Sequence, residues 1–474
     1  MRIQLSWMLL LALSACGTDT NNNLPVSSPT EPPPSQSRYD GSGLNEHVIA
    51  SYQALETLMA DAAMDNTVTY YALPLSNDYD NIPSDPQNPI TKEKVALGKL
   101  IFHETGITAG ITDMKNTYSC ASCHHAKAGF KAGVAQGIGE GGEGFGQAGE
   151  SRTVVEGLDQ MADVQPIASP TVLNTAYQEV MAWNGQFGNQ EDGLVNAGLP
   201  VTQLMPDDTP KAANRFGLSG LETQVIAGSD VHRLDVSDTS ILQTHPTYTA
   251  LFEAAFPYGY DSLAIAAAKA VAAYERTVLA NQAPFQRWLQ GDNHAMSAEQ
   301  IAGARVFFGT GQCVSCHTGP GLSSPVDAIA DNLFMSIGFG DLDLNRDIIG
   351  IVPENVRLGR GGFTGIAMDN YRFKVPTLYN LKDTAIFGHG ATFSSIEEVV
   401  DYKIAGVPQV ANANLDHRFM PLLLSEQERA DLIAFLSDAL YDDNLERYTA
   451  QSLPTTLCPI NNDTVSRAEL GCGE

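Results

Sequence analysis

The motif Cys-x-x-Cys-His occurs twice in this chain of 474 residues, at 120–124 and at 313–317. Two cysteines spaced in this way and followed directly by a histidine are typical of covalent c-type haem attachment, in which the histidine becomes an axial ligand of the iron. A bare Cys-x-x-Cys pair has zinc binding and thioredoxin-like chemistry as alternatives. Since the two copies use four of the seven cysteines, we expect two haem c groups. The residues expected to hold them are Cys120, Cys123, His124, Cys313, Cys316 and His317.

A short apolar segment near the N-terminus ends in the run LSAC at positions 13–16. It is too short to span a bilayer and predicts a signal peptide. The run resembles a bacterial lipobox, so residues 1–16 are expected to be a lipoprotein-type signal peptide with Cys16 as the lipidated residue; an ordinary signal peptide is the alternative. We therefore expect a periplasmic or cell-surface protein, held at the outer membrane only by that lipid. Export agrees with the motifs, because c-type haem is attached outside the bacterial cytoplasm.

The rest of the chain predicts a mostly α-helical protein with two cytochrome-c-like haem domains and long loops. Residues 17–45, rich in Asn, Pro and Ser, predict a disordered tether. The expected units are an N-terminal haem domain at 46–290, a C-terminal haem domain at 291–447 and a tail at 448–474. The tail holds Cys458 and Cys472, which an oxidising compartment is expected to join in a disulfide.

Apolar residues at helical spacing give the expected helices. They are 45–64, 92–102, 262–289, 297–308, 395–404 and 425–440. Gly- and Pro-rich stretches predict loops, and loops this long usually carry function or line a cofactor. They lie at 128–149, 184–220 and 319–365.

The chain is acidic, with a formal net charge of −28. Such a charge argues against nucleic acid and anionic membrane surfaces as partners. It suits a basic redox protein as partner, although acidity of this kind often reflects only habitat or solubility.

Seven runs, in their order and in their positions relative to both motifs, resemble the bacterial di-haem cytochrome c peroxidases, a family that includes the MauG-type enzymes. They are 97–102 (LGKLIF), 169–174 (SPTVLN), 183–185 (WNG), 274–277 (YERT), 303–308 (GARVFF), 373–380 (FKVPTLYN) and 384–390 (TAIFGHG). The resemblance covers residues 92 to 440. It implies peroxide chemistry at the N-terminal haem and electron transfer at the C-terminal haem.

The resemblance also implies roles for single residues near the first haem. Trp183 stands where the family has a Trp between the haems, which would relay electrons; a buried interface aromatic is the alternative. Gln224 matches a family Gln. Asp235 falls at the family's acidic position, although this chain has one extra residue between Gln224 and Gly228. The alternative is that Asp235 is only a surface carboxylate, in which case Glu222 would be the acidic residue.

Two further residues of the same run suit peroxide cleavage on chemical grounds. His232 is a candidate base, and Arg233 is a candidate to polarise the O–O bond. The alternative for Arg233 is a partner of a haem propionate. Many family members carry a blocking His in the loop after the first haem, where this chain has Glu140. A carboxylate binds haem iron poorly, so the first haem is expected to be five-coordinate or water-bound.

The distal ligand of the second haem is Met in the family's peroxidases and Tyr in MauG-type enzymes. The matching position here is Lys403, whereas Tyr402 is turned about 100° around a helix. Three possibilities for the distal ligand remain open: Lys403, Tyr402, or neither of the two. His389 matches a family His near this haem.

The family also has an interdomain calcium ion. Its Asn ligand is replaced by Ala168 in this chain, while the backbone carbonyls of Thr384 and Ile386 could still serve. Calcium therefore remains open as a cofactor.

Three functions follow from these features. The favoured one is a peroxidase that reduces hydrogen peroxide to water with electrons from a small cytochrome c or a cupredoxin. The second is a MauG-like oxidase that withdraws electrons from Trp or Tyr of a partner protein through high-valent iron; the missing blocking His and the lack of a Met ligand favour it. The third is a non-catalytic electron-transfer cytochrome, against which the long loops and the run 224–235 argue.

Overall fold

The computed structural model describes residues 37–473 except 111–113, 159–160, 189–194, 324–332, 343–351 and 412–413. The expected signal peptide, its Cys16 and most of the expected tether lie outside the described residues. Within the described part, no helix has the length and apolar character needed to cross a membrane.

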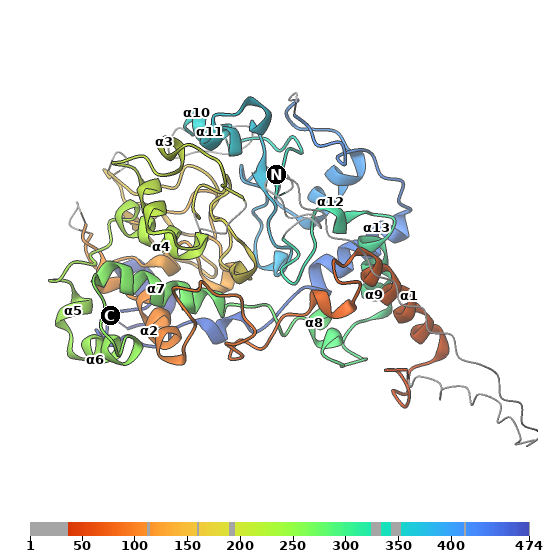
Figure 1. The fold of residues 1–474 in the computed structure, drawn as a ribbon, viewed down its shortest axis with the longest axis horizontal. Coiled ribbons are helices and arrows are strands. Elements are labelled where there is room, and N and C mark those ends of the chain that lie inside the picture. Colours follow the sequence, from red (N-terminus) through yellow and green to blue (C-terminus); the bar gives the residue numbers. More distant parts are fainter. Residues whose placement is uncertain are drawn as a thin grey trace, which may run out of the picture.

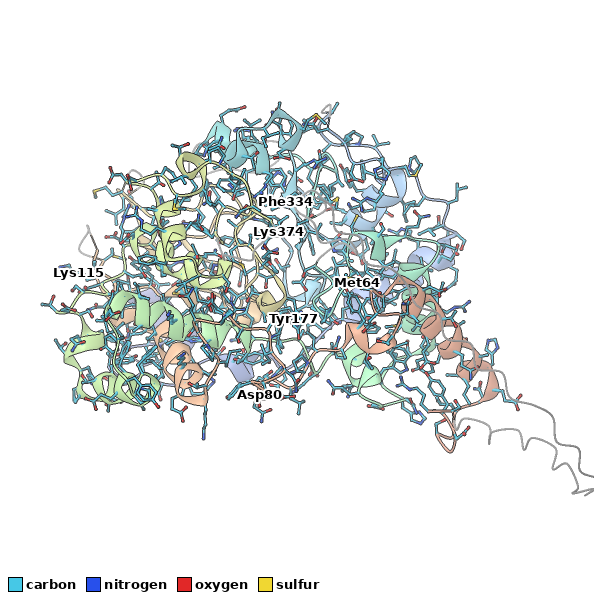
Figure 2. All side chains as sticks on the ribbon, in the orientation of Figure 1. Met64, Asp80, Lys115, Tyr177, Phe334 and Lys374 are labelled. Atoms are coloured by element: carbon cyan, nitrogen blue, oxygen red, sulfur yellow. A yellow bond between two sulfur atoms is a disulfide. The ribbon has the colours of Figure 1, made fainter. Side chains whose placement is uncertain are left out.

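The described chain is mostly helical, as the sequence predicts, and has two small antiparallel sheets (Figure 1). The α-helices are α1 (Glu46–Ala62), α2 (Lys92–His103), α3 (Val201–Leu204), α4 (Gly220–Val231), α5 (Ile241–Thr244), α6 (Pro246–Ala255), α7 (Leu263–Arg276), α8 (Pro284–Leu289), α9 (Ala298–Phe308), α10 (Glu354–Arg357), α11 (Arg360–Thr364), α12 (Ile396–Ala405), α13 (Glu426–Ala434) and α14 (Thr464–Leu470). The sheets pair β1 (Gly142–Glu143) with β2 (Thr153–Val154), and β3 (Phe334–Met335) with β4 (Phe373–Lys374). Figure 2 places Phe334 and Lys374 of the second sheet together near the middle of the molecule.

Each half of the molecule contains the same close helix crossing. Helices α2 and α7 pack at Gly98, where an added Cβ would lie 1.9 Å from the carbonyl oxygen of Ala270. Helices α9 and α13 pack at Gly303, where an added Cβ would lie 1.9 Å from the carbonyl oxygen of Asp431. Only glycine permits such an approach of two backbones. The two halves are therefore built around equivalent helix pairs.

Two expected helices have different bounds in the structure. The run 262–289 forms two helices, because α7 ends at Arg276 and α8 begins only at Pro284. Proline lacks a backbone N–H and fits in the first turn of a helix but not in its interior. The run 425–440 forms α13 and then one π-helical segment, Phe435–Ala439. Helices α3, α4, α5, α6, α10, α11 and α14 lie outside the helices predicted from the sequence.

The N-terminal helix packs with the second half rather than the first. Helix α1 lies beside α9, on the side of the molecule away from α2 (Figure 1). Just before α1, Tyr39 is 2 % exposed and stacks on Tyr52. Residues 37–45, predicted as part of the tether, thus belong to the packed body, and the unit predicted at 46–290 does not coincide with one packed half.

The C-terminal tail returns to the first half. The hydroxyls of Ser119 and Ser122, both at the first motif, donate to the carbonyl of Ile460 at 2.9 and 3.0 Å. The predicted disulfide between Cys458 and Cys472 is present. The tail therefore packs over the first motif, and the disulfide closes part of the tail into a loop.

The double variant Cys458→Ser/Cys472→Ser is expected to lower the free energy of unfolding by about 3 kcal/mol, because a bond across a separation of 14 residues restricts the unfolded chain. Urea unfolding of the haem-loaded protein measures the change. Wild-type protein unfolded with a reductant is the control and should match the variant. An unchanged midpoint in both samples would contradict the stabilising role of this loop.

Candidate functional site

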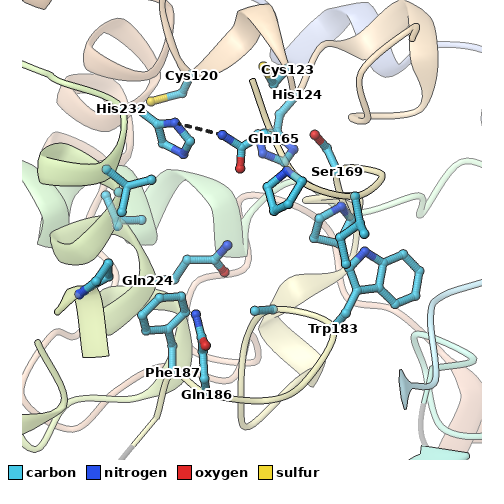
Figure 3. Close-up of a pocket in the computed structure, with 18 of the residues that line it drawn as sticks. Cys120, Cys123, His124, Gln165, Ser169, Trp183, Gln186, Phe187, Gln224 and His232 are labelled. Carbon is cyan, nitrogen blue, oxygen red and sulfur yellow. Dashed lines mark hydrogen bonds between the residues drawn. The ribbon is translucent and has the colours of Figure 1, made fainter. Parts of the chain in front are cut away.

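A cavity of about 380 Å³ lies against the first motif. Its wall combines the motif, the loops around 165–170 and 182–187, and faces of α4 and α7. In Figure 3, Gln224 and Trp183 flank the cavity from opposite sides. The residues predicted from the sequence that line it are Cys120, Cys123, His124, Trp183, Gln224 and His232.

The two motifs share one backbone conformation. Each begins with a short 3-10 turn, Cys120–Ser122 in the first and Cys313–Ser315 in the second. The N–H of His124 then donates to the carbonyl of Cys120 at 3.1 Å, and the N–H of His317 donates to that of Cys313 at 3.0 Å. The same arrangement of thiols and imidazole is thus built in both halves.

Both motif histidines are oriented as metal ligands. Nδ1 of His124 lies 3.3 Å from the carbonyl oxygen of Phe130, and Nδ1 of His317 lies 3.1 Å from those of Leu322 and Pro376. A ring N–H given to a carbonyl fixes the imidazole and leaves Nε2 for a metal. Burial lowers the pKa of both imidazoles to about 4, so each ring is neutral near pH 7, the form that binds iron.

The cysteines fit haem attachment better than zinc or dithiol chemistry. The four motif cysteines are not in disulfides. Burial raises the pKa of Cys120, Cys123 and Cys313 to about 12, whereas zinc ligands and redox dithiols depend on the thiolate form. In the described part of the chain, no group of three or more His, Cys, Asp and Glu is placed to hold a metal ion.

A carboxylate orients the histidine in the cavity wall. His232 caps the C-terminal end of α4, and its Nδ1 lies 2.8 Å from Oδ2 of Asp163. The Gln165 amide nitrogen lies 3.4 Å from the same ring nitrogen (Figure 3). When Nδ1–H donates to the carboxylate, Nε2 is the basic nitrogen, and it makes no hydrogen bond to the described residues. Asp163 was not predicted from the sequence, because 69 residues separate it from its partner.

One face of α4 forms this side of the cavity. Gln224, Gly228 and His232 recur at intervals of four residues and all line the cavity, as expected for one helix face. Only the His232 ring comes within 4 Å of a Cβ added at Gly228, at 3.7 Å. An added Cβ at Gly228 would thus lie in ordinary contact with the imidazole.

Three predicted residues are not in the cavity wall. Asp235 accepts from the backbone N–H and the hydroxyl of Ser237 at 3.0 and 2.6 Å, so it holds a local turn and is not placed for acid–base chemistry. Arg233 has a φ of 54°, and its side chain pairs with the fully buried Glu140 at 2.6 Å. Arg233 is thus not placed to polarise peroxide. Glu140 is engaged in this pair.

Two other buried carboxyl groups lie near the cavity. Glu222, the fallback acid, does not line it and forms a bidentate pair with Arg276 at 2.7 and 3.1 Å. The next residue of α7, Glu275, does line it. Burial and then the nearby charge of Glu222 raise the pKa of Glu275 to about 8. Glu275 belongs to the run YERT but was not predicted as a site residue from the sequence.

Trp183 lies between the two motifs. It lines the first cavity, and its ring centroid lies 6.3 Å from that of His389. Its carbonyl accepts the N–H of Lys374 on β4 at 2.7 Å. Two residues further on, Pro376 provides a carbonyl that lies 3.1 Å from Nδ1 of His317. A short backbone path thus joins the indole residue to the second motif.

Two backbone carbonyls at the positions considered for calcium accept hydrogen bonds from protein groups. The carbonyl of Ala168 accepts Nε1–H of Trp183 at 2.7 Å. The carbonyl of Ile386 accepts a hydrogen bond from the Lys131 amine, which also lies 5.8 Å from the ring centroid of Phe387. A calcium ion at Ile386 would have to displace this amine.

Tyr402 and Lys403 of α12 pack against the same two aromatic rings, those of Phe339 and Phe419. The Tyr402 hydroxyl donates to the carbonyl of Ile337, and burial raises its pKa to about 12. The Lys403 amine lies 5.6 and 5.5 Å from the ring centroids of Phe339 and Phe419. Burial lowers the pKa of Lys403 to about 8.

Known proteins resemble this chain over most of its length. Residues 92–294 match the family described as di-haem cytochrome c peroxidase. The methylamine utilization protein MauG of Methylorubrum extorquens is 28% identical over 359 residues, which cover 75% of this chain and 81% of MauG. The cytochrome-c peroxidase IdrP1 of Denitromonas iodatirespirans is 29% identical over 378 residues, which cover 75% of this chain and 83% of that protein.

A solved structure shares the fold. It is a MauG-like protein associated with microbial copper homeostasis, with a TM-score of 0.54 and 24% identity, covering 79% of this chain and 95% of that one. With the two motifs and the cavity, these similarities define an oxidoreductase with two c-type haems. In sequence the chain is similar to the di-haem cytochrome c peroxidase family, over residues 92–294 for the family model and over 75% of its length for the two relatives.

Proposed function

We propose that this protein is a peroxidase that reduces hydrogen peroxide in the cavity beside His124, with two electrons and two protons giving two waters. The observation that carries the proposal is the His232–Asp163 pair in the wall of that cavity. A haem held by Cys120, Cys123 and His124 would supply the redox-active iron.

The cavity residues supply the proton chemistry. His232 takes a proton from one peroxide oxygen on Nε2 and returns it to the other oxygen, while Asp163 holds Nδ1–H and stabilises the imidazolium form. The Gln224 amide, in the same wall of the cavity, binds the peroxide by hydrogen bonds. General acid–base catalysis of this kind contributes about 10²- to 10⁴-fold in rate.

A haem held by Cys313, Cys316 and His317 would supply electrons, and Trp183, which lines the cavity, would relay them. The donor is a small redox protein, a cytochrome c or a cupredoxin, and the net charge of −28 favours a basic one. The protein acts in the periplasm, the compartment of this family, where residues 1–16 would direct it and the lipid on Cys16 would hold it at the outer membrane.

Trp183→Phe is expected to lower kcat for peroxide reduction with an external donor while both haems stay attached, because phenylalanine is harder to oxidise than indole. Steady-state oxidation of a reduced cytochrome c measures kcat. The matched control is Trp288→Phe, which alters an indole that stacks on Tyr52, remote from the cavity wall. Equal kcat values for wild type and Trp183→Phe would rule out the relay.

A second candidate function is the oxidation of Trp or Tyr in a partner protein. The observation that favours it is the pair Tyr402 and Lys403 on α12, where the family's peroxidases have a Met ligand. Peroxide consumption that needs a reduced cytochrome selects the first function. Peroxide-dependent covalent change in a co-exported partner, with no oxidation of the cytochrome, selects the second.

A further inference from the structure

We propose that Glu275 is a proton donor of the cavity beside the first motif, in addition to the base His232. Its carboxyl group holds a proton at neutral pH and gives this proton to a peroxide oxygen as water forms. The inference rests on the proposed function, because the reduction of peroxide is the reaction that consumes the proton.

Glu275 lies in the last turn of α7, on the helix face that borders the cavity. Val271, four residues earlier, also lines the cavity, as expected for one helix face. Helix α4, which carries Gln224 and His232, lies beside α7 (Figure 1), and Ala272 packs with α4 in one hydrophobic cluster. Glu275 and His232 thus belong to adjoining parts of one cavity wall.

The Glu275 side chain makes no hydrogen bond or ion pair with the described residues, although Glu275 is only 7% exposed. The next residue, Arg276, is engaged elsewhere. Its guanidinium forms the bidentate pair with Glu222 and also donates to the Ser219 hydroxyl and the Pro83 carbonyl, at 3.0 and 3.1 Å. One guanidinium therefore serves the Glu222 carboxyl, and the Glu275 carboxyl has only the cavity beside it.

The other titratable groups around Glu275 leave no cation for it among the described residues. They are Lys94, Lys99 and His103 of α2, Lys269 and Tyr274 of α7, Tyr177, and Cys120, His124 and His232 of the cavity wall. The three lysine amines donate to carbonyl oxygens, and His232 pairs with Asp163. Burial lowers the pKa of His103 and His124 to about 4 and raises the pKa of both tyrosines, so these four side chains are neutral near pH 7. Cys120 becomes a thioether when haem is attached.

A buried carboxyl group in this position keeps its proton, because a carboxylate without a partner is costly away from water. Burial is the largest cause that raises the pKa of Glu275 to about 8, the charge of Glu222 is the next, and the charge of Arg276 acts in the opposite direction. Glu275 is thus a neutral acid at pH 7 and becomes a carboxylate as the pH rises through about 8. An acid and a base held in one site by different environments are the usual arrangement for proton transfer.

Peroxide reduction needs such a donor. One peroxide takes up two electrons and two protons and gives two waters. His232 only moves a proton that peroxide already carries from one oxygen to the other, so both consumed protons come from solution. Glu275 gives its proton to an oxygen that has gained electrons from the redox partner, becomes a carboxylate and is protonated again from solvent. Two such cycles complete one turnover.

The test uses the exported protein with both haems attached and measures kcat for peroxide-dependent oxidation of a reduced cytochrome c. In wild type, kcat should fall as the pH rises through about 8, where the donor loses its proton. Glu275→Gln keeps the shape but has no proton to give, so its kcat should be lower by about 10²-fold and show no such fall. Glu275→Asp should recover part of kcat together with the fall. Glu253→Gln, which alters an exposed carboxyl on α6, is the matched control and should keep the wild-type profile.

Infrared spectra of the same proteins report the proton without turnover. A protonated carboxyl group has a carbonyl stretch at higher frequency than the amide bands. Wild type and Glu253→Gln should show such a band at pH 7 that disappears as the pH rises through about 8. Glu275→Gln should lack this band.

Equal pH profiles of kcat in Glu275→Gln and Glu253→Gln would overturn the proposal, and so would a carboxylic-acid band that Glu275→Gln leaves unchanged. The two measurements also separate this inference from the proposed function. Turnover in wild type with an unchanged Glu275→Gln profile contradicts the role of Glu275 alone. If wild type shows no turnover, the peroxidase function is contradicted; a band that Glu275→Gln removes then still supports the buried acid, and absence of the band in wild type overturns it.

Discussion

His232→Ala lowers kcat/KM for hydrogen peroxide by about 10²- to 10⁴-fold, the usual contribution of a positioned acid–base group. The reason is that Nε2 is the basic nitrogen of a ring held by Asp163 at 2.8 Å in the cavity wall. The variant should keep both haems, since His232 is not part of either motif. Steady-state oxidation of a reduced cytochrome c by peroxide, at matched haem content, gives the ratio.

Two further variants complete this experiment. Asp163→Asn keeps the shape of the partner but removes its charge, so it should lower kcat/KM less than His232→Ala does. His47→Ala removes an exposed imidazole on α1 and should leave kcat/KM unchanged. A His232→Ala variant as active as His47→Ala would exclude the imidazole as the base.

Arg276→Met lowers the free energy of unfolding by about 3–5 kcal/mol, because it leaves a buried carboxylate without its partner. The Arg276 and Glu222 side chains are 4% and 0% exposed and are joined by two hydrogen bonds. Urea unfolding of the haem-loaded protein measures the loss. Because the pair lies next to Glu275 in the cavity wall, Arg276→Met should also have a lower peroxide activity than wild type.

A double variant separates the ion pair from simple packing. Glu222→Leu/Arg276→Met removes both charges and should recover part of the loss. The double variant cannot recover the whole loss in the free energy of unfolding, because Asn88 and Ser219 also donate to the Glu222 carboxylate. Arg215→Met breaks an exposed pair with Asp207 and should cost less than about 1 kcal/mol. A loss in Arg276→Met no larger than that in Arg215→Met would contradict the prediction.

Local patterns in the sequence predicted the parts of the structure that depend on neighbouring residues. The motif residues 120–124 and 313–317 fold into the same turns because their spacing is contained in five positions. Helix α9 begins where Ser297 and Gln300 form a capping box, a pattern visible in the sequence. The disulfide was predictable from compartment and position in the tail.

Contacts between distant segments could not be predicted in this way. The partner of His232 is Asp163, which no local pattern links to it. Asp235 matched the family position by counting, but the left-handed conformation of Arg233 directs the following backbone toward Ile107. The packing of α1 on α9 likewise depends on tertiary contacts that residue spacing does not encode.

The most direct test of the account is peroxide-dependent oxidation of a reduced cytochrome c by the two-haem protein, with wild type and His232→Ala measured side by side. Wild type is expected to oxidise two cytochromes for each peroxide consumed, and His232→Ala is expected to be slower by about 10²-fold or more. Equal rates in the two proteins, or no peroxide-dependent oxidation by wild type with both haems attached, would contradict it.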